Sequence, residues 1–197
     1  MFSFHATGKL ANALVYFGWK GLDVVRSYVI PTNPKTTAQN TQRGYLTAAV
    51  AAIHAAEILA AHLLTSVDKA AYALYASCAN TPRTWFNQMA KAWVYAAAHG
   101  EHPQILGAGT FTDVGAGATT LVLWNYTLPT EPGFIWCGVS KTAMLTSVAA
   151  TGVANVHTGA FTGLTKGVEY FYQFRPTKVT DDKHCARSGI YHHVQLN

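Results

Sequence analysis

Charged residues are scarce in this sequence. Asp, Glu, Lys and Arg make up 12% of the 197 residues, about half the usual share of roughly 25%, and nine of them are acidic. The adjacent Asp181 and Asp182 are best interpreted as a turn, because the two carboxylates of a glycoside hydrolase come from separate elements. The surface must carry small polar residues or be buried against partners, which suits a subunit of an assembly.

Motifs of common enzyme classes are missing. The sequence contains no P-loop, no Rossmann glycine pattern and no Gly-x-Ser-x-Gly elbow. Its three cysteines, Cys78, Cys137 and Cys185, form no C-x-x-C pair. A bridge between Cys137 and Cys185 is an open alternative, but the odd number favours reduced thiols.

Nine histidines are present without a recognisable zinc spacing. His99 and His102 form an isolated H-x-x-H pair. His192 and His193 are adjacent in a predicted strand, so we expect them to face opposite sides and not to chelate one ion. The sequence therefore predicts no metal, no cofactor and no enzymatic activity.

The basic residues are dispersed. Net charge is +5 and the isoelectric point about 9.1, yet no basic run indicates a specific nucleic-acid site. We interpret the basic residues as ordinary solvated surface cations, with binding to an acidic protein surface as the alternative. The apolar stretch Tyr45–Leu64 contains His54, Glu57 and His62 and is rich in alanine. We therefore interpret it as a buried helix and not as a membrane span.

The first apolar segment lies between Leu10 and Ile30. Two runs rich in β-branched and aromatic residues flank a segment containing Gly18 and Gly21, which predicts a β-hairpin or a pair of extended arms. An isolated hairpin is marginal in water. The aromatic side chains must therefore pack on the helices or dock on a neighbouring subunit.

An alanine-rich helical module follows. Prolines at positions 31 and 34 end the extended segment, and a helix is expected to begin at Thr36 or Thr37 and to continue to Leu64. Thr65–Asp68 resembles a capping box and predicts a second helix to about Cys78.

Thr81 followed by Pro82 predicts the start of a third helix, which Gly100 closes. Apolar residues at helical spacing then give it one apolar stripe, formed by Trp85, Phe86, Met89, Trp93 and Ala97.

From residue 104 the pattern changes to short alternating strands. The glycine-rich segment Gly107–Thr110 is interpreted as linker and turn. The regular turn spacing predicts an antiparallel β-sandwich, with strands expected at 119–126, 134–141, 144–148, 156–162, 168–176 and 188–196. The predicted class is thus α+β, with a hairpin and helical module over residues 1–103 and a β-sandwich domain over residues 104–197.

Leu164–Tyr170 resembles the tyrosine corner of fibronectin type III domains, although Lys166 stands where that family usually has proline. Leu121–Trp124 resembles the family's early strand, and Arg187–Ile190 its last-strand entry. The resemblance implies a fibronectin III or immunoglobulin-like sandwich from Thr110 onward, in which the Tyr170 hydroxyl bonds to the backbone just upstream.

Trp19–Arg43 resembles a pattern of tailed-phage and prophage proteins. The pattern is a W-x-G hairpin and an arginine, followed by P-x-N-P-x-T-x-x-Q-x-x-x-R at the opening of a helix. The resemblance implies a virion structural protein, assembled in the bacterial host cytoplasm. Its expected partners are other virion proteins (the major capsid protein or tail proteins) and copies of itself.

Within the particle, a capsid decoration or cement role is expected. A tail or neck (head–tail connector) component is the first alternative and a glycan- or cell-surface-binding module the second. The hairpin-to-helix junction is the candidate partner interface, although an intramolecular clamp is an open alternative. Its candidate residues are Tyr16, Trp19, Arg26, Tyr28, Asn33, Pro34, Gln39 and Arg43.

Overall fold

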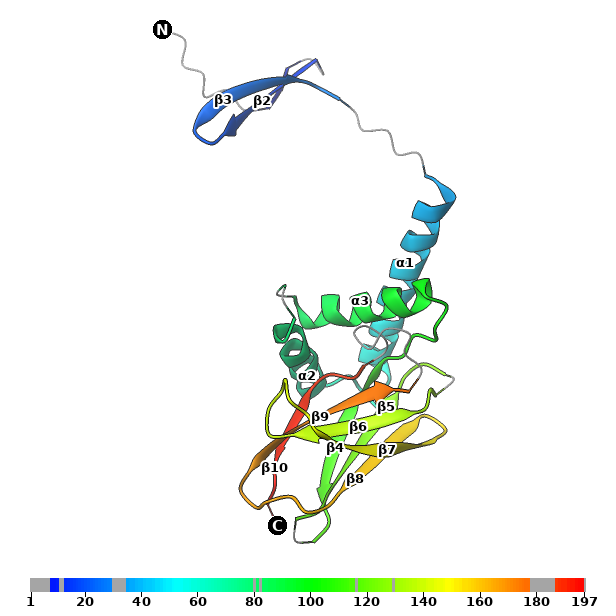
Figure 1. The fold of residues 1–197 in the computed structure, drawn as a ribbon. Coiled ribbons are helices and arrows are strands. Elements are labelled where there is room, and N and C mark those ends of the chain that lie inside the picture. The colour runs from blue at the N-terminus through cyan, green and yellow to red at the C-terminus, as the bar shows by residue number, and fades with distance from the viewer. Residues whose placement is uncertain are drawn as a thin grey trace. The chain divides into compact units, whose positions relative to one another are not determined.

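The computed structural model describes residues 8–10, 13–29, 35–79, 81, 83–115, 117–128, 130–177 and 187–196. Contacts divide the chain into two compact units, Met1–Thr36 and Thr37–Asn197. Each unit is built from its own elements (Figure 1). The candidate residues Asn33 and Pro34 lie outside the described residues, as do Asp181, Asp182 and Cys185.

The first unit is a three-stranded antiparallel sheet with the order β1-β2-β3. Its strands are β1 (Gly8–Leu10), β2 (Leu14–Trp19) and β3 (Leu22–Ser27). Lys20 and Gly21, with φ of 50° and 81°, form the two-residue turn between β2 and β3. Positive φ at both positions matches the right-handed twist of the strands. The predicted hairpin is confirmed, and the short β1 adds a third strand to it.

The first helix, α1 (Thr37–Ile58), begins where the sequence predicts it but ends six residues early. The prediction that it continues to Leu64 is wrong. The chain turns back after Ile58, and the Leu64 N–H donates to the Ala56 carbonyl at 3.1 Å. This turn buries Leu64 in the core between the helices, which contains Ile53 and Ile105.

The second helix, α2 (Ser66–Ser77), has the predicted capping box. The Asp68 N–H donates to Thr65 Oγ1 at 3.4 Å, and the Thr65 N–H donates to Asp68 Oδ2 at 2.7 Å. Two backbone donors at the helix start thereby gain partners. Cys78 is the C-cap residue, so the predicted end is confirmed as well.

The third helix, α3 (Trp85–Ala98), starts three residues later than the sequence predicts. Thr84, not Thr81, is the N-cap, and its Oγ1 accepts a 3.2 Å bond from the Asn87 N–H. Two threonines in one short segment can both serve as caps, and packing decides between them. At the other end Gly100 has φ of 70°, and the Glu101 N–H donates to the Ala96 carbonyl. This Schellman closure confirms the predicted end.

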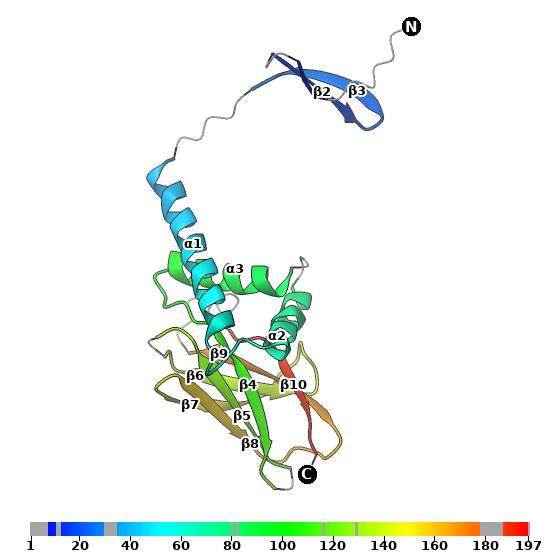
Figure 2. The same ribbon diagram turned by 180° about the vertical axis from the view of Figure 1, so that it is seen from behind.

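The rest of the second unit is one antiparallel sheet of seven strands, nearly barrel-shaped (Figures 1 and 2). Its order is β10-β9-β6-β7-β8-β5-β4. Strand β7 pairs with β6 through residues 146–150 and with β8 through residues 151–153. The α+β class is therefore confirmed, whereas a separate two-sheet sandwich is not. The strands are β4 (Leu106–Asp113), β5 (Thr119–Asn125), β6 (Gly133–Gly138), β7 (Thr146–Val153), β8 (Val156–Phe161), β9 (Glu169–Pro176) and β10 (Tyr191–Val194).

Three of the predicted strands, 119–126, 156–162 and 168–176, match β5, β8 and β9 to within one residue. Strand β6 stops at Gly138, because a turn follows in which the Ala143 N–H donates to the Ser140 carbonyl. Strand β10 starts three residues later than predicted. Before it, the Ile190 N–H donates to the Ala71 carbonyl of α2 at 2.9 Å.

The interpretation of Gly107–Thr110 as a linker is wrong, because this segment lies within β4. A β-bulge shifts the register between Gly107 and Thr110. The glycines make room for neighbouring side chains. A Cβ on Gly107 would lie 2.8 Å from Leu64 Cδ1, and one on Gly109 would lie 2.4 Å from Tyr191 Cε1. Large side chains therefore pack directly against this strand.

The helices gather at one end of the sheet (Figures 1 and 2). One core lies within the sheet and a second between the helices and Ile105. A Cβ on Gly189 would lie 2.7 Å from the Ala71 carbonyl carbon, so α2 and the segment before β10 are in close contact. The predicted boundary at residue 103 falls within this compact unit.

The predicted tyrosine-corner hydrogen bond is present. The Tyr170 hydroxyl accepts a bond of 3.0 Å from the Thr165 N–H. The bond ties the start of β9 to the turn before it.

Candidate interaction surface

One face of the N-terminal sheet is apolar. In an antiparallel pair, directly opposite residues share a face, and alternate residues along a strand do too. Val15 lies opposite Arg26, Phe17 opposite Val24, and Trp19 opposite Leu22. These pairs all lie on the same side of the sheet. We call the following residues the apolar sheet face: Val15, Phe17, Trp19, Leu22 and Val24.

The apolar sheet face is open at the hairpin end. Trp19 is 60% exposed and Leu22 is 69% exposed, and the two residues form the cross-strand pair next to the turn. Among the first unit's residues whose burial the structure describes, none is buried. These residues therefore form no core of their own.

Cations border the apolar sheet face. The Arg26 guanidinium lies 5.3 Å from the centre of the Phe17 ring, a cation–π distance. The Lys9 ammonium donates a 2.9 Å hydrogen bond to the Tyr28 hydroxyl and lies 4.4 Å from the centre of that ring. Residues 1–36 contain four Lys or Arg residues and a single acidic residue, Asp23. An acidic partner surface would match this border.

The structure brings only some of the predicted interface residues together. Trp19 and Arg26 lie on the side of the apolar sheet face, whereas Tyr16 pairs with Val25 on the opposite side. Gln39 and Arg43 are exposed in the first turns of α1, one helical turn apart. They belong to the second unit.

Sequence reasoning missed Leu22, Val15 and Val24 as interface candidates. The two-residue turn over Lys20 and Gly21 fixes the register, and the register fixes which side chains share a face. The signal was therefore in the sequence, because pairing outward from this turn puts Leu22 opposite Trp19.

Elsewhere among the described residues, groups that could bind a metal or react are few. Across those residues, no cluster of three or more His, Cys, Asp or Glu side chains could hold a metal ion. His192 bonds to Glu169 and His193 to Asp113, so the two rings face opposite sides as predicted. Cys78 and Cys137 are free thiols, and burial raises the pKa of Cys137 to about 11. This pKa keeps the Cys137 thiol protonated and unreactive at neutral pH.

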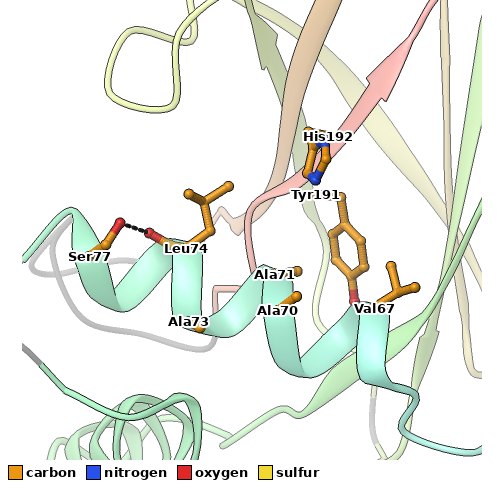
Figure 3. A pocket seen from close by; sticks show the side chains of 8 residues that line it. All are labelled: Val67, Ala70, Ala71, Ala73, Leu74, Ser77, Tyr191 and His192. Carbon is orange, nitrogen blue, oxygen red and sulfur yellow. Dashed lines mark hydrogen bonds between the residues drawn. The ribbon is translucent and has the colours of Figure 1, made fainter.

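A hollow of about 530 Å³ lies between α2 and β10 (Figure 3). Alanines 70, 71 and 73 line much of it, and Tyr191 extends across it toward the start of α2. The His192 ring at its border is bonded to Glu169 at 2.8 Å. The lining is mainly apolar and has no pair of groups arranged for acid–base chemistry.

Among the described residues, no helix is both long enough and apolar enough to cross a membrane. No protein-family model matches this chain, and no curated protein matches it at a significant level.

Proposed function

We propose that this chain is a non-enzymatic structural protein of a tailed-phage particle that docks on the particle through its apolar sheet face. The observation that carries the proposal is the exposed cross-strand pair Trp19 and Leu22, on a sheet in which no residue of described burial is buried. The pattern over Trp19–Arg43 makes a phage particle the assembly we propose.

Burial of apolar side chains favours a state in which a partner covers the apolar sheet face. Removing one large apolar side chain from water contributes about 1.5–3 kcal/mol. Docking the five residues of the apolar sheet face would therefore contribute several kcal/mol, enough to offset the marginal stability of three short strands. Tryptophan and arginine are also the side chains that most often dominate binding energy at interfaces, and Trp19 and Arg26 lie on this side together.

Within the particle we propose a decoration or cement role on the capsid, with a tail or neck position as the alternative. The second unit has its own cores and capped helices. It can therefore fold independently while the first unit docks. This division between an anchoring element and a stable body suits a protein that braces a shell from outside.

We also propose that the sheet of the second unit is a fibronectin type III-like sandwich. Strand β7 divides its pairing between β6 and β8, which separates the strands into the groups β10-β9-β6 and β8-β5-β4. Side chains of the two groups meet in the core, where the Phe161 and Tyr172 ring centres lie 5.3 Å apart. The Thr165–Tyr170 bond supports the same assignment.

The test compares particles of the encoding phage assembled with different variants of the chain. Trp19→Ser combined with Leu22→Ser removes the exposed pair. Leu145→Ser is the matched control, because Leu145 is 86% exposed and lies in the second unit. Quantitative mass spectrometry of purified particles gives the copies per particle.

We expect wild type and the control to be incorporated equally. The copies per particle of the double variant should fall to about a tenth or less of the wild-type number, since the side chains of Trp19 and Leu22 together contribute about 3 kcal/mol or more to binding. Circular dichroism of each purified variant verifies the fold of the second unit. Wild-type incorporation of the double variant would contradict docking through the apolar sheet face. Absence of the wild-type chain from particles would contradict the virion role.

A further inference from the structure

A second surface lies on the helices of the second unit. Helix α3 crosses α1 near the sheet, and the first half of α1 continues beyond this crossing (Figures 1 and 2). None of residues 37–48 of α1 is buried. A groove of about 410 Å³ lies at this crossing, lined by Leu46, Arg83, Asn87, Ala90, Lys91 and Val94.

The groove has an apolar lining on both helices. Leu46 of α1 is 51% exposed, and Ala90 and Val94 of α3 lie one turn apart. Asn87 precedes Ala90 by three residues and lies on the same side of α3. A stripe of this spacing is the surface that an amphipathic helix recognises when it packs into a groove.

Two cations, Arg83 and Lys91, border this lining. Among the described residues, no carboxylate forms an ion pair with Arg83 or Lys91, and Arg83 bonds only to the neutral Gln88 side chain, at 3.4 Å. Burial, and then the charge of Arg83, lower the pKa of Lys91. Two acidic side chains of this unit are engaged elsewhere, Glu57 with Lys69 and Asp113 with His193. A carboxylate placed between Arg83 and Lys91 would therefore be stabilised by both.

We propose that this groove binds an amphipathic helix of a partner protein that carries apolar residues flanked by acidic ones. Arg83 lies just before the N-cap of α3 and Lys91 lies within the helix, eight residues later. This is a separation of roughly 10–15 Å, which a helix spans in about seven to eight residues. The partner therefore presents two carboxylates about two turns apart, with leucine-like side chains between them.

The charge and the apolar lining of the groove favour an acidic amphipathic helix over two other occupants. A nucleic-acid backbone would neutralise the cations but would leave Leu46 and Val94 without apolar contacts. A second copy of this chain would bring a net charge of +5 toward the same cations. The groove lies wholly in the second unit, so the proposal does not depend on the apolar sheet face.

The test uses two labelled synthetic helical peptides on the full chain at low ionic strength. One has two glutamates about seven positions apart with two leucines between them, and the other has lysines in place of the glutamates. Fluorescence anisotropy measures their binding to wild type and to Arg83→Glu combined with Lys91→Glu. Lys166→Glu is the matched control, because Lys166 is an exposed cation in the turn before β9.

We expect saturable binding of the acidic peptide to wild type and the control, and binding about ten-fold or more weaker to the double variant. The basic peptide should show the reverse preference. The two peptides compared on wild type alone already test the charge requirement, so the result does not depend on how the variant folds.

Equal binding of both peptides to wild type, or no saturable binding of the acidic one, would overturn the proposal. Self-association of the chain that the double variant abolishes, measured by analytical ultracentrifugation, would assign the groove to a second copy and would overturn it as well.

Discussion

The hydroxyl of Tyr191 donates a hydrogen bond of 2.7 Å to Oδ1 of Asp68, 123 residues earlier in the chain. Both side chains are buried, with Asp68 0% and Tyr191 1% exposed. The same carboxylate accepts bonds from the N–H groups of Thr65 and Gly109. One buried side chain thus connects the start of α2 to β4 and β10.

Replacing Asp68 should be strongly destabilising. Asp68→Ala leaves the part-buried N–H groups of Thr65 and Gly109 and the buried Tyr191 hydroxyl without their acceptor, and we expect a loss of about 3 kcal/mol in the free energy of unfolding. Tyr191→Phe removes one of these bonds and should cost about 1–2 kcal/mol. Urea denaturation measures both. Val67→Ala is the adjacent control at a 60% exposed position, and a loss for Asp68→Ala no larger than that of this control would contradict the assignment.

Two glycines should respond in opposite directions to alanine. Gly109→Ala places a Cβ 2.4 Å from Cε1 of Tyr191, which Asp68 holds in place, so we expect a loss of about 2 kcal/mol. Gly44 lies inside α1, and a Cβ added there would meet no atom within 4 Å, so Gly44→Ala should stabilise by about 0.5–1 kcal/mol. Thermal unfolding of the two variants measures both effects. Equal shifts in the unfolding temperature of the two variants would show that the fold does not require a glycine at position 109.

Acid should weaken the fold through His157. Its side chain is fully buried, and burial lowers its pKa to about 4, whereas the unfolded value is about 6.5. As pH falls below about 6.5 the unfolded chain binds a proton that the folded chain excludes. Stability should therefore fall between about pH 6.5 and 4, by up to about 3 kcal/mol.

The His157→Gln variant isolates this contribution. Its free energy of unfolding should change less with pH over that range than that of wild type, even if its stability at pH 7 is lower. Asp113, whose pKa is lowered by its bonds to Thr119 and His193, contributes equally to both proteins. Identical pH slopes, measured by urea denaturation at several pH values, would exclude His157 as the source.

The tyrosine-corner bond should make a modest contribution. Tyr170→Phe removes the acceptor of the Thr165 N–H, and we expect a cost of about 1 kcal/mol. Chemical denaturation measures the change. Tyr45→Phe is the control, since Tyr45 is half-buried in α1 and distant in sequence. A smaller effect for Tyr170→Phe than for the control would argue against a stabilising corner.

Local signals were sufficient for many elements of the fold. The capping box at Thr65 and Asp68, the alternation in β5 and the corner at Tyr170 all depend on residues close in sequence. Strand β4 was missed because its glycines, typical of a linker, are required by Tyr191 and Leu64, which lie far away in the chain. The end of α1 was missed because the burial of Leu64 against Ile105 is a tertiary effect.

The two candidate surfaces also differ in whether the sequence alone predicts them. Pairing outward from the turn at Lys20 and Gly21 gives the apolar sheet face from sequence alone. The groove of Leu46 and Lys91 depends on how α1 and α3 cross, and no local pattern encodes that crossing.

The separation between Asp68 and Tyr191 also sets an order of events during synthesis. The paired strands of the first unit span residues 8–27, so its sheet can form before the second unit has been translated. By contrast, Asp68 at the start of α2 gains the hydrogen bond from Tyr191 only after β10 has been translated. If the apolar sheet face is the proposed docking element, a nascent chain displays it before the second unit has folded, and attachment at that stage is avoided only when the partner surface is out of reach.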